Sequence, residues 1–568
     1  MRILLLASSF NALTQRIHVE LAERGHELSV ELDVNDAGVT EAVRMFRPDL
    51  VIAPFLRRAI PEAVWRAVRC LVVHPGPVGD RGPAALDWAI LEGRTAWGTT
   101  LIQANETFDA GDVWTSRTFA LRPASKSSIY RDEVTEAAVA CVVEAIGRIA
   151  DRAGNATPFA QAAPDGGRWR PALKIEERAV DWSRDTTETV LRKLRAASGQ
   201  PGVPDIVFGL RARLHDPCPE DALRGPPGAV IARRDGAICR ATVDGAVWIG
   251  SITPEPTPGG RRFKIPATLA LAGRLDEVPE RPLAPDASAN TFREIAYREA
   301  GGVGWLSFDF LNGAMSVDQC RRLLAAYEAA VARPVKVIVL AGGREFWSNG
   351  MHLGVIEAAA SPADASWANI NAIDDLARAV LLTSDKLVIA ALEGNAGAGG
   401  VFLALGADRV LARDGIVLNP HYKNMGNLYG SEYWTYVLPR RVGAERLAAV
   451  MGSRMPMGAA AARRIGLADA VLPNARAGFR AAVRDYAERL AADPAFDRLL
   501  ADKRARRARD EAEKPLAAYR DEELKRMRLA FYGFDPSYHG ARWRFITREP
   551  IARTPLHLAR HRVMVAAP

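Results

Sequence analysis

The sequence predicts a multidomain α/β protein, and three features of the chain support this prediction. Strand and helix patterns alternate over residues 1–152, as they do in doubly wound sheets. They alternate again in a second unit that begins near Phe292. Between the two, short β segments are flanked by stretches rich in Gly and Pro. At 568 residues the chain is also too long for a single hydrophobic core.

The N-terminal stretch is expected to form a doubly wound sheet. Its predicted strands are Arg2–Ser8, Glu27–Val34, Asp49–Phe55, Cys70–His74, Gly98–Ala104 and Val113–Leu121. Its predicted helices are Thr14–Arg24, Val39–Phe46, Pro61–Val68 and Ser127–Arg152. Ligands of such sheets bind beyond the carboxyl ends of the strands, and His74 stands at one of these ends.

A small, mostly β module is expected next. Residues 153–170 are rich in Gly, Pro and Ala and are predicted to be a linker. One helix is expected at about Thr186–Ala197. The predicted strands of the module are Val207–Leu214, Gly228–Ala232, Ala237–Val243 and Ala246–Ile252. A second hinge, rich in Pro and in charged residues, is expected at about residues 276–290.

The last part of the chain is predicted to be α/β again. Its expected strands are Val303–Phe308, Val335–Leu340, Leu387–Ala391 and Arg409–Ala412. Residues 496–527 are dense in both charges and helix formers, which predicts a helical tail with a solvated face. These patterns divide the chain into three predicted domains, residues 1–165, 166–285 and 286–568.

The composition is ordinary for a globular protein, with 48% hydrophobic and 25% charged residues. The net charge of +8 is spread along the whole chain, so anionic metabolites explain it and a nucleic-acid partner is not expected. The five cysteines form no CxxC pair, which argues against a disulfide framework and against a metal site. No apolar run reaches the length of a membrane span, and the apolar start is too short for a signal peptide. A cytoplasmic location without membrane contact is therefore expected.

The turn after His74 and the loop around Asp109 form the first candidate site. Proton shuttling at a one-carbon centre needs an imidazole and a carboxylate close together, plus a donor for the developing oxyanion. His74 precedes the rigid turn Pro75-Gly-Pro77, and Gly111 allows the loop that carries Asp109 to fold back tightly. With Arg81-Gly-Pro-Ala-Ala85 and Gly98-Thr-Thr-Leu-Ile-Gln103, this pattern resembles the folate-dependent formyltransferase family, which includes methionyl-tRNA formyltransferase.

The formyltransferase resemblance extends over about residues 1–275 and includes Val180-Asp-Trp-Ser183. It implies a formyltransferase-like sheet followed by a small, OB-like β module, with N10-formyltetrahydrofolate as the formyl donor. It also implies that His74 and Asp109 form the catalytic pair. The folate-binding residues that it implies are Phe55, Leu56, Gly76 and Gln103.

The chain departs from the formyltransferase pattern at one position. The family has an Asn two residues before the His, and Val72 stands there in this sequence. Loss of one oxyanion donor costs about a hundred-fold or more in rate in other enzymes. Either another donor replaces it, with Gln103 and Asn105 near in sequence, or the acceptor differs from an ordinary amine.

Two Gly-rich loops form the second candidate site. Trp347-Ser-Asn-Gly-Met-His-Leu353 and Glu393-Gly-Asn-Ala-Gly-Ala-Gly-Gly400 each follow a predicted strand. Small residues let backbone N–H groups come close to a thioester carbonyl. The two loops resemble those of the crotonase (enoyl-CoA hydratase/isomerase) family over about residues 292–475. The resemblance implies an α/β spiral with a helical tail and oxyanion donors from the N–H groups of Met351 and Gly399.

The crotonase resemblance further implies that the neighbouring loop residues Asn349, Gly350, Gly397 and Ala398 bind coenzyme A. The carboxylates of the hydratases are missing, however. Phe402 stands in place of one Glu, and a second family Glu falls near His421. Without both carboxylates, hydration of an enoyl double bond has no evident acid–base pair. Tyr422 and Glu432, in the polar and aromatic segment after the second loop, are the candidates for a new proton donor–acceptor set.

A formyltransferase half joined to an altered crotonase half resembles the hydrogenase-maturation factors of the HypX or HoxX type. The resemblance includes Gly79-Asp-Arg-Gly-Pro83 and Tyr429-Gly-Ser-Glu-Tyr-Trp-Thr-Tyr436. It implies transfer of the formyl group to coenzyme A and decarbonylation of formyl-CoA, with the carbon monoxide becoming a ligand of iron in [NiFe]-hydrogenase. Folate and coenzyme A are then the small-molecule partners, and hydrogenase-maturation proteins are further expected partners. A formyl thioester has no α-carbon, so the missing carboxylates are dispensable for this chemistry.

Two other classes of function remain open at the level of the sequence. One is a hydrolase that releases formate from formyltetrahydrofolate or formyl-CoA. The other is a non-catalytic scaffold that binds folate and coenzyme A, which Val72 and Phe402 favour. A tRNA formyltransferase fits less well, because the β module lacks a concentrated basic stripe.

Overall fold

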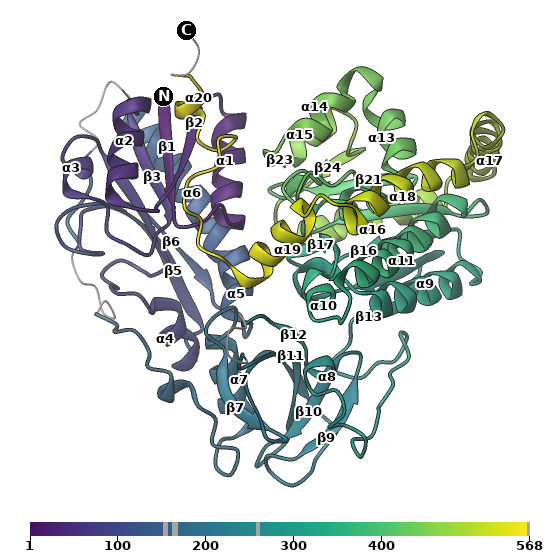
Figure 1. Cartoon of the computed structure of the whole chain (residues 1–568), viewed down its shortest axis with the longest axis horizontal. Coiled ribbons are helices and arrows are strands. Elements are labelled where there is room, and N and C mark those ends of the chain that lie inside the picture. The colour runs from purple at the N-terminus through teal and green to yellow at the C-terminus, as the bar shows by residue number, and fades with distance from the viewer. Residues whose placement is uncertain (152–156, 162–168, 257–261, 565–568) are drawn as a thin grey trace. The chain divides into compact units, whose positions relative to one another are not determined.

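The computed structural model describes residues 1–151, 157–161, 169–256 and 262–564 (Figure 1). The chain forms two compact units. The first contains Met1–Glu280, Asn290–Phe292 and Pro550–Pro568, and the second contains Arg281–Ala289 and Arg293–Glu549. Most of the predicted linker at 153–170 lies outside the described residues. The division into three domains at residues 165 and 285 stays a prediction.

Six strands build the N-terminal sheet in the order β2-β1-β3-β4-β5-β6. The strands are β1 (Arg2–Ala7), β2 (Glu27–Leu32), β3 (Leu50–Phe55), β4 (Cys70–His74), β5 (Ala96–Gln103) and β6 (Val113–Ala120). Strands β1 to β4 are parallel, whereas β5 is antiparallel to β4 and β6 is antiparallel to β5. All six predicted strands are therefore present, and the apolar start of the chain is the buried strand β1.

Helices cover this sheet, and most of them follow the predicted pattern. They are α1 (Ala12–Glu23), α2 (Asp36–Phe46), α3 (Glu62–Trp65), α4 (Ala85–Leu91), α5 (Lys126–Ile129), the π-helix Tyr130–Val134 and α6 (Thr135–Ala150). The sequence analysis missed α4, and the long helix predicted at Ser127–Arg152 is divided into three segments.

The end of the chain also belongs to the first unit, where α20 (Arg560–Met564) lies beside α2 and β2 (Figure 1). Edge strand β2 donates from Val30 N to the Leu558 carbonyl at 3.0 Å and from Leu32 N to Thr554 Oγ1 at 2.9 Å. The returning segment thus caps backbone groups that an edge strand would otherwise expose.

The module after α6 is an antiparallel sheet in the order β7-β8-β11-β10-β9, and β12 pairs with β11. Its strands are β7 (Val203–Val207), β8 (Leu210–Glu220), β9 (Val230–Arg234), β10 (Ala237–Ala241), β11 (Ala246–Pro254) and β12 (Ile265–Pro266). Its helices are the 3₁₀-helix Glu176–Arg178, α7 (Thr187–Ala196) and α8 (Ala267–Ala270).

One strand prediction in this module is wrong. The expected strand Val207–Leu214 is interrupted by a hairpin turn between β7 and β8. Phe208 and Gly209 both have positive φ, 47° and 77°, as the two central residues of a type I′ turn do. The sequence analysis missed the turn because Phe in place of the usual Asn or Asp gave no turn signal.

In the second unit, strands alternate between two sheets. The large sheet has the order β13-β14-β16-β19-β21-β24 and the small sheet the order β17-β20-β22-β23. The large sheet contains β13 (Ile295–Ala300), β14 (Val303–Phe308), β16 (Val337–Ala341), β19 (Leu387–Leu392), β21 (Arg409–Arg413) and β24 (Ala470–Leu472). The small sheet contains β17 (Phe346–Ser348), β20 (Asn395–Gly397), β22 (Val417–Asn419) and β23 (Met457–Gly458). Three times in succession the chain passes from a strand of the large sheet to one of the small sheet, which is the expected spiral.

Helices cover both faces of the large sheet. The helices of this unit include α9 (Val317–Val331), α10 (Leu353–Glu357), α11 (Pro362–Leu382), α12 (Gly399–Leu405), α13 (Trp434–Val442), α14 (Leu447–Gly452), α15 (Ala459–Arg464), α16 (Arg476–Ala491), α17 (Phe496–Glu513), α18 (Leu516–Tyr532) and α19 (Ser537–Thr547). Shorter segments are the 3₁₀-helices Leu311–Gly313 and Ala444–Arg446 and the strand pair β15 (Ala314–Met315) and β18 (Gly350–Met351). Successive β16 residues point to opposite faces, so Ile338 joins the core on the α9 and α11 side, while Val339 joins the core that α16 and α17 cover.

The helical tail predicted at 496–527 is present as α17 and most of α18. It is more than a solvated face, because α18 buries Leu516, Glu523 and Met527. Among the helices of the described residues, none is both long enough and apolar enough to cross a membrane.

Candidate active sites

The structure brings the two predicted catalytic residues of the first site together. His74 ends β4, and its Nδ1 lies 3.6 Å from Oδ2 of Asp109. Asp109 has a left-handed φ of 55°, which Asp tolerates better than most residues, and its Oδ2 accepts a 3.1 Å hydrogen bond from Gly82 N. Burial raises the pKa of the Asp109 carboxyl, although His74 and the Gly82 N–H act in the opposite direction.

The loop that carries Asp109 turns back as tightly as Gly111 predicts. A Cβ on Gly111 would lie 1.8 Å from the carbonyl oxygen of Gln103, so only glycine fits there. Gln103 itself is held elsewhere, because its Oε1 accepts a hydrogen bond from Trp114 Nε1 at 3.1 Å. It pairs with Leu71, three residues along β4 from His74.

The strand register also places the folate-binding residues expected from the family. Strands β3 and β4 are parallel neighbours, so Phe55 and Leu56 lie at the same edge of the sheet as His74. The Phe55 ring meets the Tyr130 ring edge to face, with centroids 6.0 Å apart. Gly76 lies two residues after His74, and a Cβ there would lie 2.5 Å from Nε2 of the imidazole. These residues surround the carboxyl ends of the strands, where ligands of such sheets bind.

Val72, in the position of the family's oxyanion-donating Asn, carries no polar group, and the amide oxygens of the two candidates near in sequence are bound to other residues. Val72 lies two residues before His74 in β4, so both side chains face the same side of the sheet. Asn105 is exposed, and its Oδ1 accepts from Thr107 N at 3.0 Å. Gln103 is bound to Trp114, as described above.

Sequence reasoning missed two residues at this site. Oδ2 of Asp80 lies 3.2 Å from Nε2 of His74, and Nε of Arg170 donates to Oδ1 of Asp80 at 2.8 Å. Asp80 belongs to the Gly-Asp-Arg-Gly-Pro segment noted in the sequence, which was a signal for it. Arg170 is 90 residues from Asp80 and carried no signal.

The second site is built where the two Gly-rich loops meet. Strand β17 overlaps the start of the first loop and β20 lies within the second, and these two strands are parallel neighbours. A Cβ on Gly350 would lie 3.5 Å from Gly399 N, and a Cβ on Gly400 would lie 2.0 Å from the Ser348 carbonyl oxygen. Gly399 opens α12, so its N–H has no partner within the helix. The two loops thus approach each other closely.

The residues expected near coenzyme A lie in the same two loops. Asn349 Nδ2 donates to the Asn312 carbonyl at 2.7 Å, and a Cβ on Gly397 would lie 2.9 Å from Asn349 Oδ1. Gly350 and Met351 form β18. Ala398 has a φ of 47°, which turns the chain into α12.

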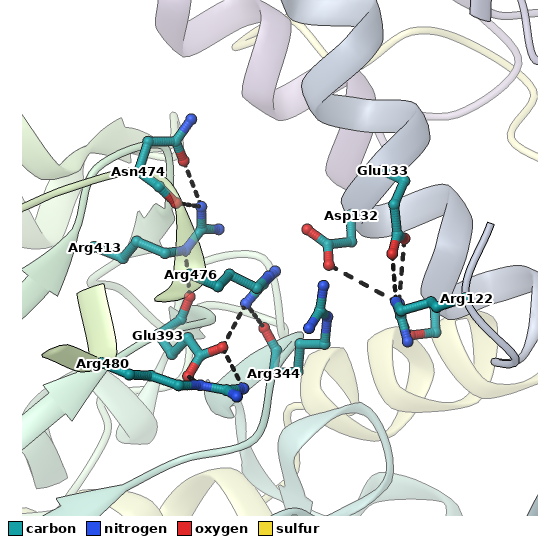
Figure 2. Close-up of polar contacts among 10 residues, drawn as sticks. Arg122, Asp132, Glu133, Arg344, Glu393, Arg413, Asn474, Arg476 and Arg480 are labelled. Atoms are coloured by element: carbon teal, nitrogen blue, oxygen red, sulfur yellow. Dashed lines mark hydrogen bonds and ion pairs between the residues drawn. The ribbon is translucent and has the colours of Figure 1, made fainter. Parts of the chain in front are cut away.

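Arginines fix the start of both loops, as Figure 2 shows. One guanidinium nitrogen of Arg476 donates to the Arg344 carbonyl at 2.7 Å and to Glu393 Oε1 at 3.1 Å. Arg480 Nε donates to Glu393 Oε2 at 2.7 Å, and Arg413 Nε donates to the Glu393 carbonyl at 2.8 Å. Arg344 precedes the first loop and Glu393 begins the second. The cluster therefore fixes the starts of the two loops relative to each other.

Tyr422 and Glu432, predicted as a pair, are in contact beside the second loop. Tyr422 Oη donates to Glu432 Oε2 at 2.6 Å, and Ser431 N donates to the same oxygen at 3.2 Å. A Cβ on Gly399 would lie 2.0 Å from Glu432 Oε1, so the other oxygen lies against the second Gly-rich loop. Burial, and then the nearby Asp374 carboxylate, raises the pKa of Glu432, and burial raises that of Tyr422.

Two carboxylates that sequence reasoning missed hold Glu432 in place. Glu432 and Tyr433 both have left-handed φ values, 60° and 58°, which is a strained pair for non-glycine residues. Asp374 of α11 accepts a 2.8 Å hydrogen bond from Glu432 N, and Glu523 of α18 accepts one from Tyr433 N at 3.0 Å. Asp374 lies on the buried face of α11 beside Ile373, and such a carboxylate was the available signal.

The two residues that replace the hydratase carboxylates are buried. Phe402 is fully buried, and its ring stacks on that of Tyr422 with centroids 5.3 Å apart and an interplanar angle of 20°. His421 is 5% exposed, and its backbone N–H donates to the Asn419 carbonyl. The aromatic ring at position 402 therefore packs against the phenol that donates to Glu432.

These folds and sites define the class of the protein, a formyltransferase fold joined in one chain to an enoyl-CoA hydratase/isomerase fold. The sequence profile of the formyl transferase family matches residues 6–146, and that of its C-terminal domain matches residues 172–263. The enoyl-CoA hydratase/isomerase profile matches residues 312–527. Methionyl-tRNA formyltransferase from Bacillus licheniformis is 24% identical over 43% of this chain and 77% of that protein.

The whole chain matches one kind of protein. The hydrogenase maturation factor HoxX of Bradyrhizobium diazoefficiens is 55% identical over 99% of this chain and 98% of that protein. The crystal structure of HypX from Aquifex aeolicus in complex with tetrahydrofolic acid has 49% identity and a TM-score of 0.96, over 99% of both chains. The chain belongs to the HypX/HoxX family of hydrogenase maturation factors, which confirms the resemblance seen in the sequence.

Proposed function

We propose that this protein makes carbon monoxide for hydrogenase maturation in two steps, formyl transfer from N10-formyltetrahydrofolate to coenzyme A and decarbonylation of formyl-CoA. The Tyr422–Glu432 pair is the observation that carries this proposal. It lies beside Gly399, in the position where a hydratase would work on an acyl thioester, but the carboxylates for hydration are absent. The tetrahydrofolate bound to the Aquifex aeolicus HypX supports a folate substrate.

The first step takes place at His74 and Asp109. The imidazole accepts the proton of the coenzyme A thiol as sulfur attacks the formyl carbon. The C–S bond forms, the C–N bond to folate breaks, and the imidazole returns the proton to the folate nitrogen. The Asp109 carboxyl is mostly buried and lies 3.6 Å from His74 Nδ1. It stays beside the imidazole while the ring takes up and releases the proton.

The second step takes place at the loops of the second unit. The N–H groups of Met351 and Gly399 polarise the formyl carbonyl, and Asn349, Gly350, Gly397 and Ala398 contact the thioester arm. Glu432 takes the formyl proton, the C–S bond breaks with its electron pair on sulfur, and carbon monoxide leaves. The proton then returns to sulfur, so formyl-CoA yields carbon monoxide and coenzyme A.

Burial suits this site to the reaction. A carboxylate whose pKa is raised by burial holds a proton more strongly, so Glu432 is a better base than an exposed Glu. Tyr422 Oη donates to Glu432 Oε2 at 2.6 Å. This hydrogen bond orients the carboxylate. The apolar ring of Phe402 keeps this side of the site dry, which disfavours hydrolysis of the thioester to formate.

One experiment tests the proposal. The protein is incubated with formyltetrahydrofolate and coenzyme A, carbon monoxide is trapped with reduced haem protein, and formate is measured in parallel. Carbon monoxide that requires both substrates is the expected result. Formate in place of carbon monoxide would instead identify a hydrolase, and no consumption of formyltetrahydrofolate would identify a binding scaffold.

A further inference from the structure

A buried chain of charged groups runs from Arg170 through Asp80 to His74 at the end of β4. Its members Arg170, Asp80 and His74 are 2%, 1% and 3% exposed. Arg170 Nε donates to Asp80 Oδ1 at 2.8 Å, and Asp80 Oδ2 lies 3.2 Å from His74 Nε2. Asp109 approaches the other ring nitrogen, Nδ1. Each nitrogen of the imidazole therefore faces a different carboxylate.

Arg170 determines which atom donates in the contact between Asp80 and His74. A guanidinium has only donors, so the Asp80 oxygen that faces Arg170 is an acceptor. Asp80 forms an ion pair with Arg170, so its carboxylate has only acceptors and its second oxygen requires a proton on His74 Nε2. In a neutral imidazole the proton on Nε2 leaves the lone pair on Nδ1, which faces Asp109. The 3.6 Å between Nδ1 and Asp109 exceeds a hydrogen bond, so Nδ1 stays available to a substrate proton.

We propose that Asp80, fixed by Arg170, is a positioning residue that keeps His74 in the Nε2–H tautomer and so makes Nδ1 the proton acceptor of formyl transfer. The inference deepens the proposed function and rests on its first step. Asp80 acts on the reaction only through His74, as the buried Asp of a serine-protease triad acts through its histidine.

The turn after His74 is shaped around this contact. A Cβ on Gly76 would lie 2.5 Å from His74 Nε2 and 2.6 Å from Asp80 Oδ2, so any other residue at position 76 would separate the pair. The backbone brings Asp80 back to the imidazole through a 3.0 Å hydrogen bond from Asp80 N to the Pro77 carbonyl. A role in the tautomer explains why a turn so close to the catalytic histidine has no side chain at its second position.

Asp80→Asn tests the inference. Because Arg170 still requires an acceptor, the Asn oxygen turns toward the guanidinium and its NH₂ faces His74 Nε2. The ring must then accept at Nε2, and its proton moves to Nδ1. In full-length protein labelled with ¹⁵N-histidine, the His74 signals, assigned by their loss in His74→Gln among nine histidines, should change from the Nε2–H to the Nδ1–H pattern. The kcat of formyltetrahydrofolate consumption should fall about 10²–10⁴-fold, with KM changed less than about three-fold.

Glu106→Gln is the matched control, because it converts an exposed carboxylate of the neighbouring loop into an amide. It should change neither the His74 signals nor kcat. The inference is wrong if Asp80→Asn keeps the Nε2–H pattern and the wild-type kcat. Wild-type protein with His74 in the Nδ1–H tautomer would overturn it equally, even if the Asp80 variant does not fold. Absence of formyl transfer in wild-type protein would contradict the proposed function, while the tautomer of His74 would still test Asp80.

Discussion

Glu432→Gln should stop the release of carbon monoxide while formyl transfer to coenzyme A continues. Gln has nearly the shape of Glu and keeps one oxygen for the two donors at Oε2, the Tyr422 hydroxyl at 2.6 Å and Ser431 N at 3.2 Å. Those hydrogen bonds survive the change, so the free energy of unfolding should change by no more than about 1 kcal/mol. For a unit of this size that corresponds to a shift in Tm of only about 2–4 °C.

The effect on decarbonylation should be far larger, because an amide cannot take up the formyl proton. Loss of a general base costs about 10²–10⁴-fold in rate, which corresponds to about 3–5 kcal/mol in the barrier. Two measurements are made on the same reaction, trapping of carbon monoxide by reduced haem protein and quantification of formyl-CoA by mass spectrometry. Formyl-CoA should accumulate in the Gln variant.

Tyr422→Phe is the companion variant, since it removes the donor but leaves the carboxylate of Glu432. It should slow carbon monoxide release less than Glu432→Gln does. The assignment of Glu432 as the base is refuted if the Gln variant is folded, releases carbon monoxide at the wild-type rate and accumulates no formyl-CoA. In that case the pair is an ordinary part of the pocket wall.

Three further predictions concern both sites. Asp109→Asn should abolish formyltetrahydrofolate consumption, measured by absorbance, because the neutral amide no longer offsets the positive charge that His74 gains when it accepts the thiol proton; near-normal turnover would remove Asp109 from the mechanism. Phe402→Glu combined with His421→Glu should raise formate at the expense of carbon monoxide, since charged groups admit water to the site, and unchanged carbon monoxide would contradict the dry-pocket argument. Burial raises the pKa of both Glu432 and Glu523 to about 8 from 4.5, so their contribution to stability is complete below pH 4.5 and is lost as the pH rises through 8. Denaturant unfolding at pH 6 and pH 9 should therefore show a loss of stability at pH 9 that Glu523→Gln reduces; an equal loss in that variant would exclude Glu523 as a source.

Local sequence, together with the family resemblances, indicated most of the architecture and the residues of the two predicted pairs. Strand β4 and the turn after His74 appear in the sequence because an apolar run is broken by Pro and Gly at one place. The Gly-rich loops are equally visible, since the close approach of Gly399 to Glu432 leaves no room for a Cβ. The hairpin at Phe208 escaped prediction because Phe208 takes the turn position that Asn or Asp usually occupies before Gly.

The partners that hold these residues in place depend on the tertiary structure. Arg170 is 90 residues from Asp80, and Glu523 is 90 residues from Tyr433, so no spacing rule connects them. A buried charged group needs a partner, and the packing of segments that are distant in the sequence determines which group that partner is. The sequence thus indicates where His74 and the Tyr422–Glu432 pair stand, whereas the fold determines which carboxylates face the two nitrogens of His74 and how the strained backbone at Glu432 is held.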